Sequence, residues 1–213
     1  MPRDQQKYQK ALMKKRSKQK AAAKTHAARR ASSSLSLQTI LRNAHIYPLL
    51  ECLITPNWEK NELGLIQILV PRQQPDGNIC FGFYLIDNYC LGLKNTLGKV
   101  NIAPEVYRTD VLPTLYRGEV PEKCSPELAH QMIYQAIDYA AQFGFEPERD
   151  FVLTQNVLVP QGELAEPYQL TFGKNGKPFF ISGPHDNVGR ILRQLDKTAG
   201  PGNYDFLAMA PPF

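Results

Sequence analysis

The sequence predicts an α+β fold in which a mostly antiparallel sheet, built from two hairpins plus flanking strands, packs against two main helices. Apolar runs on either side of a Pro-Asp-Gly turn within 64–94 predict the first hairpin. Apolar runs around an Asn-Gly turn within 168–182 predict the second. Apolar residues at helical spacing near 126–143 and 187–197 predict the helices, whose apolar faces a sheet can bury.

The first hairpin is expected at the centre of the sheet. Both of its arms carry apolar residues on both faces, which is typical of strands that are covered on both sides. The second hairpin is expected to pair 168–172 with 178–182, because Asn-Gly tolerates the positive φ angles of a tight hairpin turn. Together the two hairpins would supply most of the sheet.

Both helices have recognisable start signals. Ser125 offers a hydroxyl cap and is followed by Pro and Glu, which are favoured in a first helical turn, while Gly144 is suited to ending the helix. The second helix is expected to be capped by either Asp186 or Asn187. The sequence leaves these two alternatives open.

The remaining segments complete the expected domain. A short helix is predicted near 37–44, and residues 49–54 predict a strand antiparallel to the first hairpin arm. Residues 95–124 contain several Gly and Pro and predict a crossing segment with at most a short helical piece. Residues 151–159 predict an element of undetermined type, and 204–209 predict a last strand that finishes the sheet.

Charge divides the 213-residue chain into a basic N-terminal arm, 1–34, and a single acidic globular domain, 35–213. The arm holds eleven Lys and Arg and one acid, Asp4, a net charge of +10, whereas the rest of the chain carries −5. A helix in the arm would be basic all round, without an apolar stripe to pack on the domain. We therefore expect the arm to be disordered or helical until an anionic partner screens its charge.

The arm predicts binding to RNA, DNA or another polyanion, because neutralising phosphates releases condensed counterions. Two alternatives remain open: a solvated tail without a ligand, and an organelle transit peptide, since 32–34 are serines and acids are scarce. The acidic domain is expected to contact a protein partner. The residues expected to contact nucleic acid are Lys14, Lys15, Arg16, Lys18, Lys20, Lys24, Arg29 and Arg30.

The stretch after the second arm of the first hairpin contains the best candidates for catalysis. If the strand continued in phase, Asp87 would lie on its apolar face with a raised pKa, so we expect a dedicated partner or the end of the strand there. A hydrolase or metal-dependent nuclease would centre on Asp87 and Cys90, with His185 and Asp186 as further candidates. The alternative is that this stretch has only a structural role, as a β-bulge in which Asn88 and Gly92 provide the bend.

Other common sites are missing from the sequence. No P-loop, Gly-x-Gly-x-x-Gly, Gly-x-Ser-x-Gly or His-Glu-x-x-His motif occurs, and the four cysteines form no Cys-x-x-Cys pair. We expect reduced thiols in a cytoplasmic protein, with no metal, no cofactor and no membrane-spanning segment. A phosphate site around Gly183, His185 and Arg190 is less favoured than a plain strand-to-helix turn. The leading prediction is a non-enzymatic, nucleoprotein- or ribosome-associated protein.

Overall fold

The chain divides into two compact units, Met1–Thr39 and Ile40–Phe213. The computed structural model describes residues 37–60, 62–160 and 168–208. The predicted basic arm, 1–34, lies outside the described residues, and so do the eight nucleic-acid contacts expected within it.

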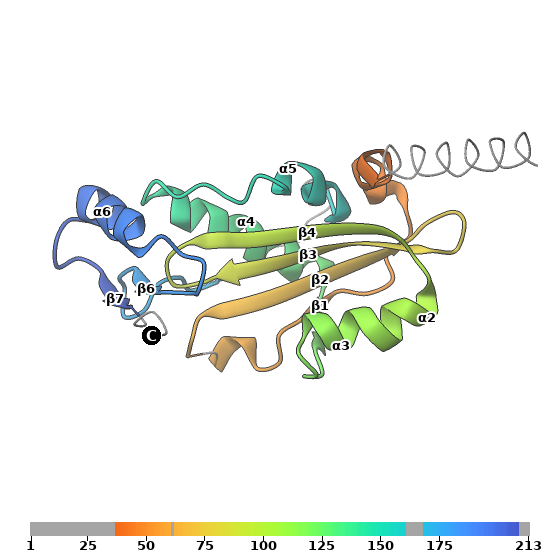
Figure 1. Cartoon of the computed structure of the whole chain (residues 1–213), viewed down its shortest axis with the longest axis horizontal. Helices are drawn as coiled ribbons and strands as arrows, with labels where there is room; N and C mark the ends of the chain where they lie inside the picture. Colours follow the sequence, from red (N-terminus) through yellow and green to blue (C-terminus); the bar gives the residue numbers. More distant parts are fainter. Residues whose placement is uncertain (1–36, 61, 161–167, 209–213) are drawn as a thin grey trace, which may run out of the picture. The chain divides into compact units, whose positions relative to one another are not determined.

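A five-stranded antiparallel sheet forms the centre of the second unit (Figure 1). Its spatial order is β4-β3-β2-β1-β5, so β1, β2 and β3 are sequential neighbours, as the predicted strand before the first hairpin requires. The α+β prediction is confirmed. The strands are β1 (Leu53–Ile54), β2 (Leu65–Gln73), β3 (Ile79–Asp87), β4 (Gly92–Ile102) and β5 (Glu122–Lys123).

The predicted first hairpin is present and joins β2 to β3. Its pairing runs without a shift from Leu65 opposite Asp87 to Gln73 opposite Ile79. At the turn, the Gln74 amide donates to the Asn78 carbonyl over 2.8 Å, and Gly77 has a φ of +84° that Gly adopts without steric cost. The local turn chemistry therefore sets the register of the two longest-paired strands.

Both faces of the hairpin are covered, as its apolar arms predict. On one face Phe81 and Tyr116 belong to a buried cluster beneath a helical segment made of α2 (Pro104–Val106), a π-helical turn (Tyr107–Val111) and α3 (Leu112–Leu115). On the other face lie α4 (Pro126–Ala141) and α5 (Phe151–Thr154) (Figure 1). There the buried Tyr84 hydroxyl donates to the Thr154 carbonyl over 2.7 Å.

The helix caps follow the sequence signals. The Ser125 hydroxyl accepts a 3.0 Å hydrogen bond from the Leu128 amide at the start of α4, and Gly144 after its end has a φ of +74°. In α6 (Val188–Thr198), the Asn187 side chain accepts from the Arg190 amide over 3.0 Å. Asn187, rather than Asp186, is therefore the cap of this helix.

The second predicted hairpin is wrong. Its turn forms, with the Lys174 amide donating to the Lys177 carbonyl, but residues 168–172 make no strand. Residues in and beside the expected arms bond elsewhere. The Asn88 carbonyl of the β3–β4 turn accepts from the Gly173 amide, and the Tyr89 carbonyl accepts from the Phe179 amide. These long-range acceptors satisfy the backbone groups that a local hairpin would otherwise pair.

Two further predictions need correction. The last strand does not finish the main sheet: β7 (Asp205–Leu207) pairs in parallel with β6 (Phe179–Ile181) in a separate two-stranded sheet. The segment after residue 95 was expected to be irregular, yet β4 continues to Ile102. Gly98 fits this strand because a Cβ there would lie 2.5 Å from Leu41 Cδ1, so the glycine permits close packing.

Candidate functional site

Asp87 is the last residue of β3 and caps the turn to β4. Its carboxylate is 4% exposed, and Oδ1 accepts hydrogen bonds from the Tyr89 and Cys90 amides, each 3.0 Å long. Both expectations for this residue hold, since the strand ends here and the carboxylate has dedicated partners. The main chain bends back within 88–91 to start β4.

The environment of this turn changes the protonation of both candidate residues. Burial raises the pKa of Asp87 to about 6, although the positive charge of Lys94 and the backbone donors pull it in the other direction. Burial, followed by the charge of Asp87, raises the pKa of the Cys90 thiol far above its usual range. Cys90 is fully buried in an apolar cluster with Phe180 and Leu195, where it packs as a neutral thiol and not as a nucleophilic thiolate.

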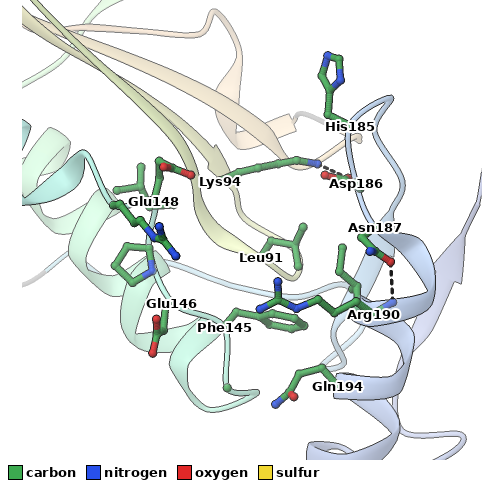
Figure 2. A pocket seen from close by; sticks show the side chains of 15 residues that line it. Leu91, Lys94, Phe145, Glu146, Glu148, His185, Asp186, Asn187, Arg190 and Gln194 are labelled. Atoms are coloured by element: carbon green, nitrogen blue, oxygen red, sulfur yellow. Dashed lines mark hydrogen bonds and ion pairs between the residues drawn. The ribbon is translucent and has the colours of Figure 1, made fainter.

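The other two candidates, His185 and Asp186, lie in the loop before α6. They line an open cavity of about 610 Å³, the polar cavity, together with residues of β4 and of the loop between α4 and α5 (Figure 2). Asp87 and Cys90 do not contribute to the lining that the described residues form. The structure therefore brings His185 and Asp186 to one cavity, to which Leu91 of the Asp87 turn also contributes, whereas Asp87 and Cys90 themselves are not among the described residues that line it.

An ion pair holds one wall of the polar cavity. Lys94 Nζ lies 2.5 Å from Asp186 Oδ2, which also accepts from the Gly183 amide over 2.7 Å (Figure 2). The two charged side chains are only 19% and 11% exposed. Asp186 thus links β4 to the loop before α6, and its charge is already engaged by a cation of the protein.

The charges around the polar cavity are balanced, so it has no net preference for an anion. Arg190 extends from α6 toward Phe145 and Leu91, while His185 points away from the interior (Figure 2). The phosphate hypothesis gains no support from this arrangement, and the loop acts as the strand-to-helix turn that the sequence favours. The lining holds three Lys or Arg, Lys94, Arg149 and Arg190, against three acids, Glu146, Glu148 and Asp186.

A second cavity of about 420 Å³, the aromatic cavity, is lined by Trp58, Tyr89 and Lys174 together with residues that include 169–171. The Lys174 ammonium lies 5.8 Å from the centroid of the Tyr89 ring. Asn88 donates to the Thr171 carbonyl over 3.0 Å. Trp58 is half-buried, so part of its ring remains accessible.

Sequence reasoning missed the aromatic cavity. No motif connects the four parts of the chain that supply its residues, which are 58–59, Gly64 with Ile66, 88–89, and 169–171 with 173–175. The one available signal was that Trp58 is the single tryptophan of the chain and lies beside a turn. A tryptophan that a compact domain leaves half-buried is a candidate for contact with a ligand.

The part of the chain that the structure describes contains neither a metal-ligand cluster nor a candidate membrane span. Among residues 37–60, 62–160 and 168–208, no three His, Cys, Asp or Glu side chains are grouped so that they could hold a metal ion. In the same part of the chain, no helix has both the length and the apolar composition that crossing a bilayer requires.

No protein-family model matches this chain, and no curated protein or solved structure matches it. Function must therefore be inferred from the chain's own residues. Three features bear on the function: the charge of the N-terminal segment, the Asp87 turn, whose carboxylate is already hydrogen-bonded, and the two cavities.

Proposed function

We propose that this protein binds RNA or DNA through its basic N-terminal segment, as a non-enzymatic component of a nucleoprotein or ribosome-associated assembly. One observation carries the proposal: residues 1–34 have a net charge of +10, whereas the remainder of the chain has −5. Such a segment gains affinity for a polyanion by releasing its counterions, independently of base sequence. The acidic remainder contributes no such counterion release, and its surface outside the aromatic cavity is available for a protein.

The aromatic cavity supports a single-stranded partner. Unpaired bases stack on aromatic side chains, and cations beside the rings contact the adjoining phosphates. Trp58 and Tyr89 supply rings and Lys174 supplies the cation. Under this proposal the N-terminal segment provides affinity and the cavity receives an exposed base. A cytoplasmic location is part of the same proposal.

The hydrolase or nuclease alternative lacks a supporting observation. The Asp87 carboxylate accepts from two amides of its own turn, and Cys90 is a fully buried thiol with a raised pKa. Asp186 is engaged by Lys94. Asp87, Cys90 and Asp186 thus each have a structural role that accounts for their position, and His185 is an exposed residue of the loop before α6.

The test is a salt titration of binding by the full-length chain. In one variant the eight basic residues from Lys14 to Arg30 predicted to contact nucleic acid become Gln, and in the matched control the lysines among them become Arg. Fluorescence anisotropy with a labelled 20-nucleotide RNA should give a log–log salt slope of about −6 for the wild type and the control, since single strands contribute about −0.7 for each of the eight neutralised phosphates. The Gln variant should lose most of this slope, since only Arg3, Lys7 and Lys10 remain basic in the arm, and should bind at least tenfold more weakly at low salt.

Equal binding by the Gln variant and the wild type would contradict the proposal. Parallel titrations with single-stranded DNA and with duplex RNA identify the preferred nucleic acid, because the aromatic cavity supports unpaired strands over duplexes.

A further inference from the structure

Two cysteines lie opposite each other at the edge of the main sheet. In the antiparallel pairing of β1 with β5, Leu53 is opposite Lys123 and Ile54 is opposite Glu122. One step further along the same register places Cys52 opposite Cys124. The Cys124 amide donates to the Cys52 carbonyl over 3.0 Å, so the pairing does extend to these residues.

Directly opposed residues of antiparallel strands project to the same face of the sheet, with Cβ atoms about 4.5–5.5 Å apart. Their Cα atoms are about 5.5 Å apart in a hydrogen-bonded pair, which lies within the range of about 4.4–6.8 Å that disulfides span. A disulfide also brings the Cβ atoms to about 3.5–4.5 Å, so its formation requires the edge strand β5 to move roughly 1 Å toward β1. The remaining cysteines have no such partner: Cys80 is opposite Arg72, and Cys90 lies in the β3–β4 turn. Among the four cysteines, only Cys52 and Cys124 are cross-strand neighbours.

The two thiols also interact electrostatically. Burial, followed by the nearby Cys124 group, raises the pKa of Cys52 to about 12, and burial raises the pKa of Cys124 to about 12. At neutral pH both are therefore thiols, and only a small fraction of either is the thiolate that attacks disulfides. Cys52 is 4% exposed, whereas Cys124 on the edge strand is half-buried and is the more accessible of the two.

We propose that Cys52 and Cys124 form a site of reversible intramolecular disulfide formation with low-molecular-mass disulfides such as oxidised glutathione. Cys124 loses its proton and attacks one glutathione sulfur, which displaces the other glutathione as a thiolate. Cys52 then loses its proton and attacks Sγ of Cys124, releasing the second glutathione. The protein dithiol gives up two electrons and two protons, and the reagent disulfide is reduced to two thiols.

The disulfide would link the N-terminus of α4 covalently to the sheet. Cys124 immediately precedes Ser125, the cap of α4, while β5 itself contributes only two residues of regular pairing. A cross-link at this point closes the whole segment between residues 52 and 124 in the unfolded chain, and long closed loops confer the larger stabilisation. Oxidation should therefore stabilise the edge of the sheet and the start of α4 together.

The experiment treats the reduced full-length protein with oxidised glutathione, then analyses intact mass and peptide maps. We expect a mass loss of about 2 Da, a single cross-linked peptide joining residues 52 and 124, and a rise in Tm of roughly 5–10 °C that dithiothreitol reverses. The initial rate should increase about tenfold from pH 7 to pH 8, because the thiolate fraction rises tenfold.

Substitution of one partner provides the control. Cys124→Ser should not lose 2 Da or gain stability on oxidation, whereas Cys80→Ser should do both, as the wild type does. The proposal is overturned if oxidation joins a different pair of cysteines, or if a glutathione adduct on Cys124 persists without resolution. It is equally overturned if the folded protein stays fully reduced under conditions that oxidise the urea-unfolded chain.

Discussion

At the scale of single residues, the protonation of Asp87 has the clearest consequence. The carboxyl group is buried at the end of β3, and its pKa in the folded protein is raised to about 6, above the value of about 3.9 in an unfolded chain. A raised pKa means that the folded state binds the proton more tightly. This contribution to stability is complete below pH 4 and is lost as the pH rises through 6.

Replacement of Asp87 by Asn should remove this pH dependence. The Asn side-chain oxygen can accept from the Tyr89 and Cys90 amides while remaining neutral, so the free energy of unfolding at pH 8 should equal or exceed that of the wild type, by up to about 3 kcal/mol. Urea unfolding at pH 4.5 and pH 8 measures the difference between the two proteins. Glu146→Gln controls for the loss of one negative charge, and an Asn variant that is less stable at pH 8 would refute the assignment.

At the scale of secondary-structure elements, the cap of α4 was predictable and the cap of α6 was narrowed to Asp186 or Asn187, because a cap involves residues only three positions apart. The Ser125 hydroxyl accepts from the Leu128 amide, and Asn187 accepts from the Arg190 amide. Removing such a cap leaves an amide of the first turn without its partner.

Substitution of Ser125 by Ala should destabilise the protein by about 1 kcal/mol, with no change in the denaturant m-value. Ser125→Asp should retain most of the stability, since Asp is an equally good cap. Urea titrations at constant ionic strength provide the comparison. Equal stability of the Ala and wild-type proteins would show that the hydrogen bond to Leu128 contributes nothing.

Elements whose partners are distant in sequence were less predictable. The Asn-Gly turn near 175 formed as expected, but its flanking residues did not pair with each other. Asn88 and Tyr89 accept from Gly173 and Phe179, and β6 pairs with β7. The local sequence pattern contained no information about these competing acceptors. The turn was therefore predicted correctly, whereas the pairing of its flanking residues was not.

At the scale of the whole molecule, the chain combines a strongly basic segment with a domain that has an aromatic cavity. The only tryptophan, Trp58, lines that cavity, so its fluorescence reports directly on occupancy. This property allows the cavity to be tested independently of the N-terminal charges, because a short ligand at high salt does not depend on counterion release.

Addition of a short single-stranded oligonucleotide at 0.5 M salt should quench the Trp58 emission to saturation. Trp58→Ala should weaken binding of the same labelled oligonucleotide by roughly 5- to 100-fold, the effect of losing one base stack. Phe206→Ala removes an exposed aromatic ring outside the cavity and should leave affinity unchanged. Unquenched fluorescence at saturating oligonucleotide would show that the cavity does not bind the nucleic acid. The role of the N-terminal segment would still be decided by the salt titration.

The sequence by itself determined the features that depend on neighbouring residues: the first hairpin and its turn, the starts of α4 and α6, the two-sided burial of the central strands, and the segregation of charge. The tertiary structure alone decided which strand β6 pairs with, what surrounds Asp87, how four segments meet at the aromatic cavity, and that Cys52 lies opposite Cys124. The reason is physical: caps and turns satisfy backbone groups within a few residues. Pairing and cavity walls depend on which of several distant partners satisfies the same groups in the folded chain.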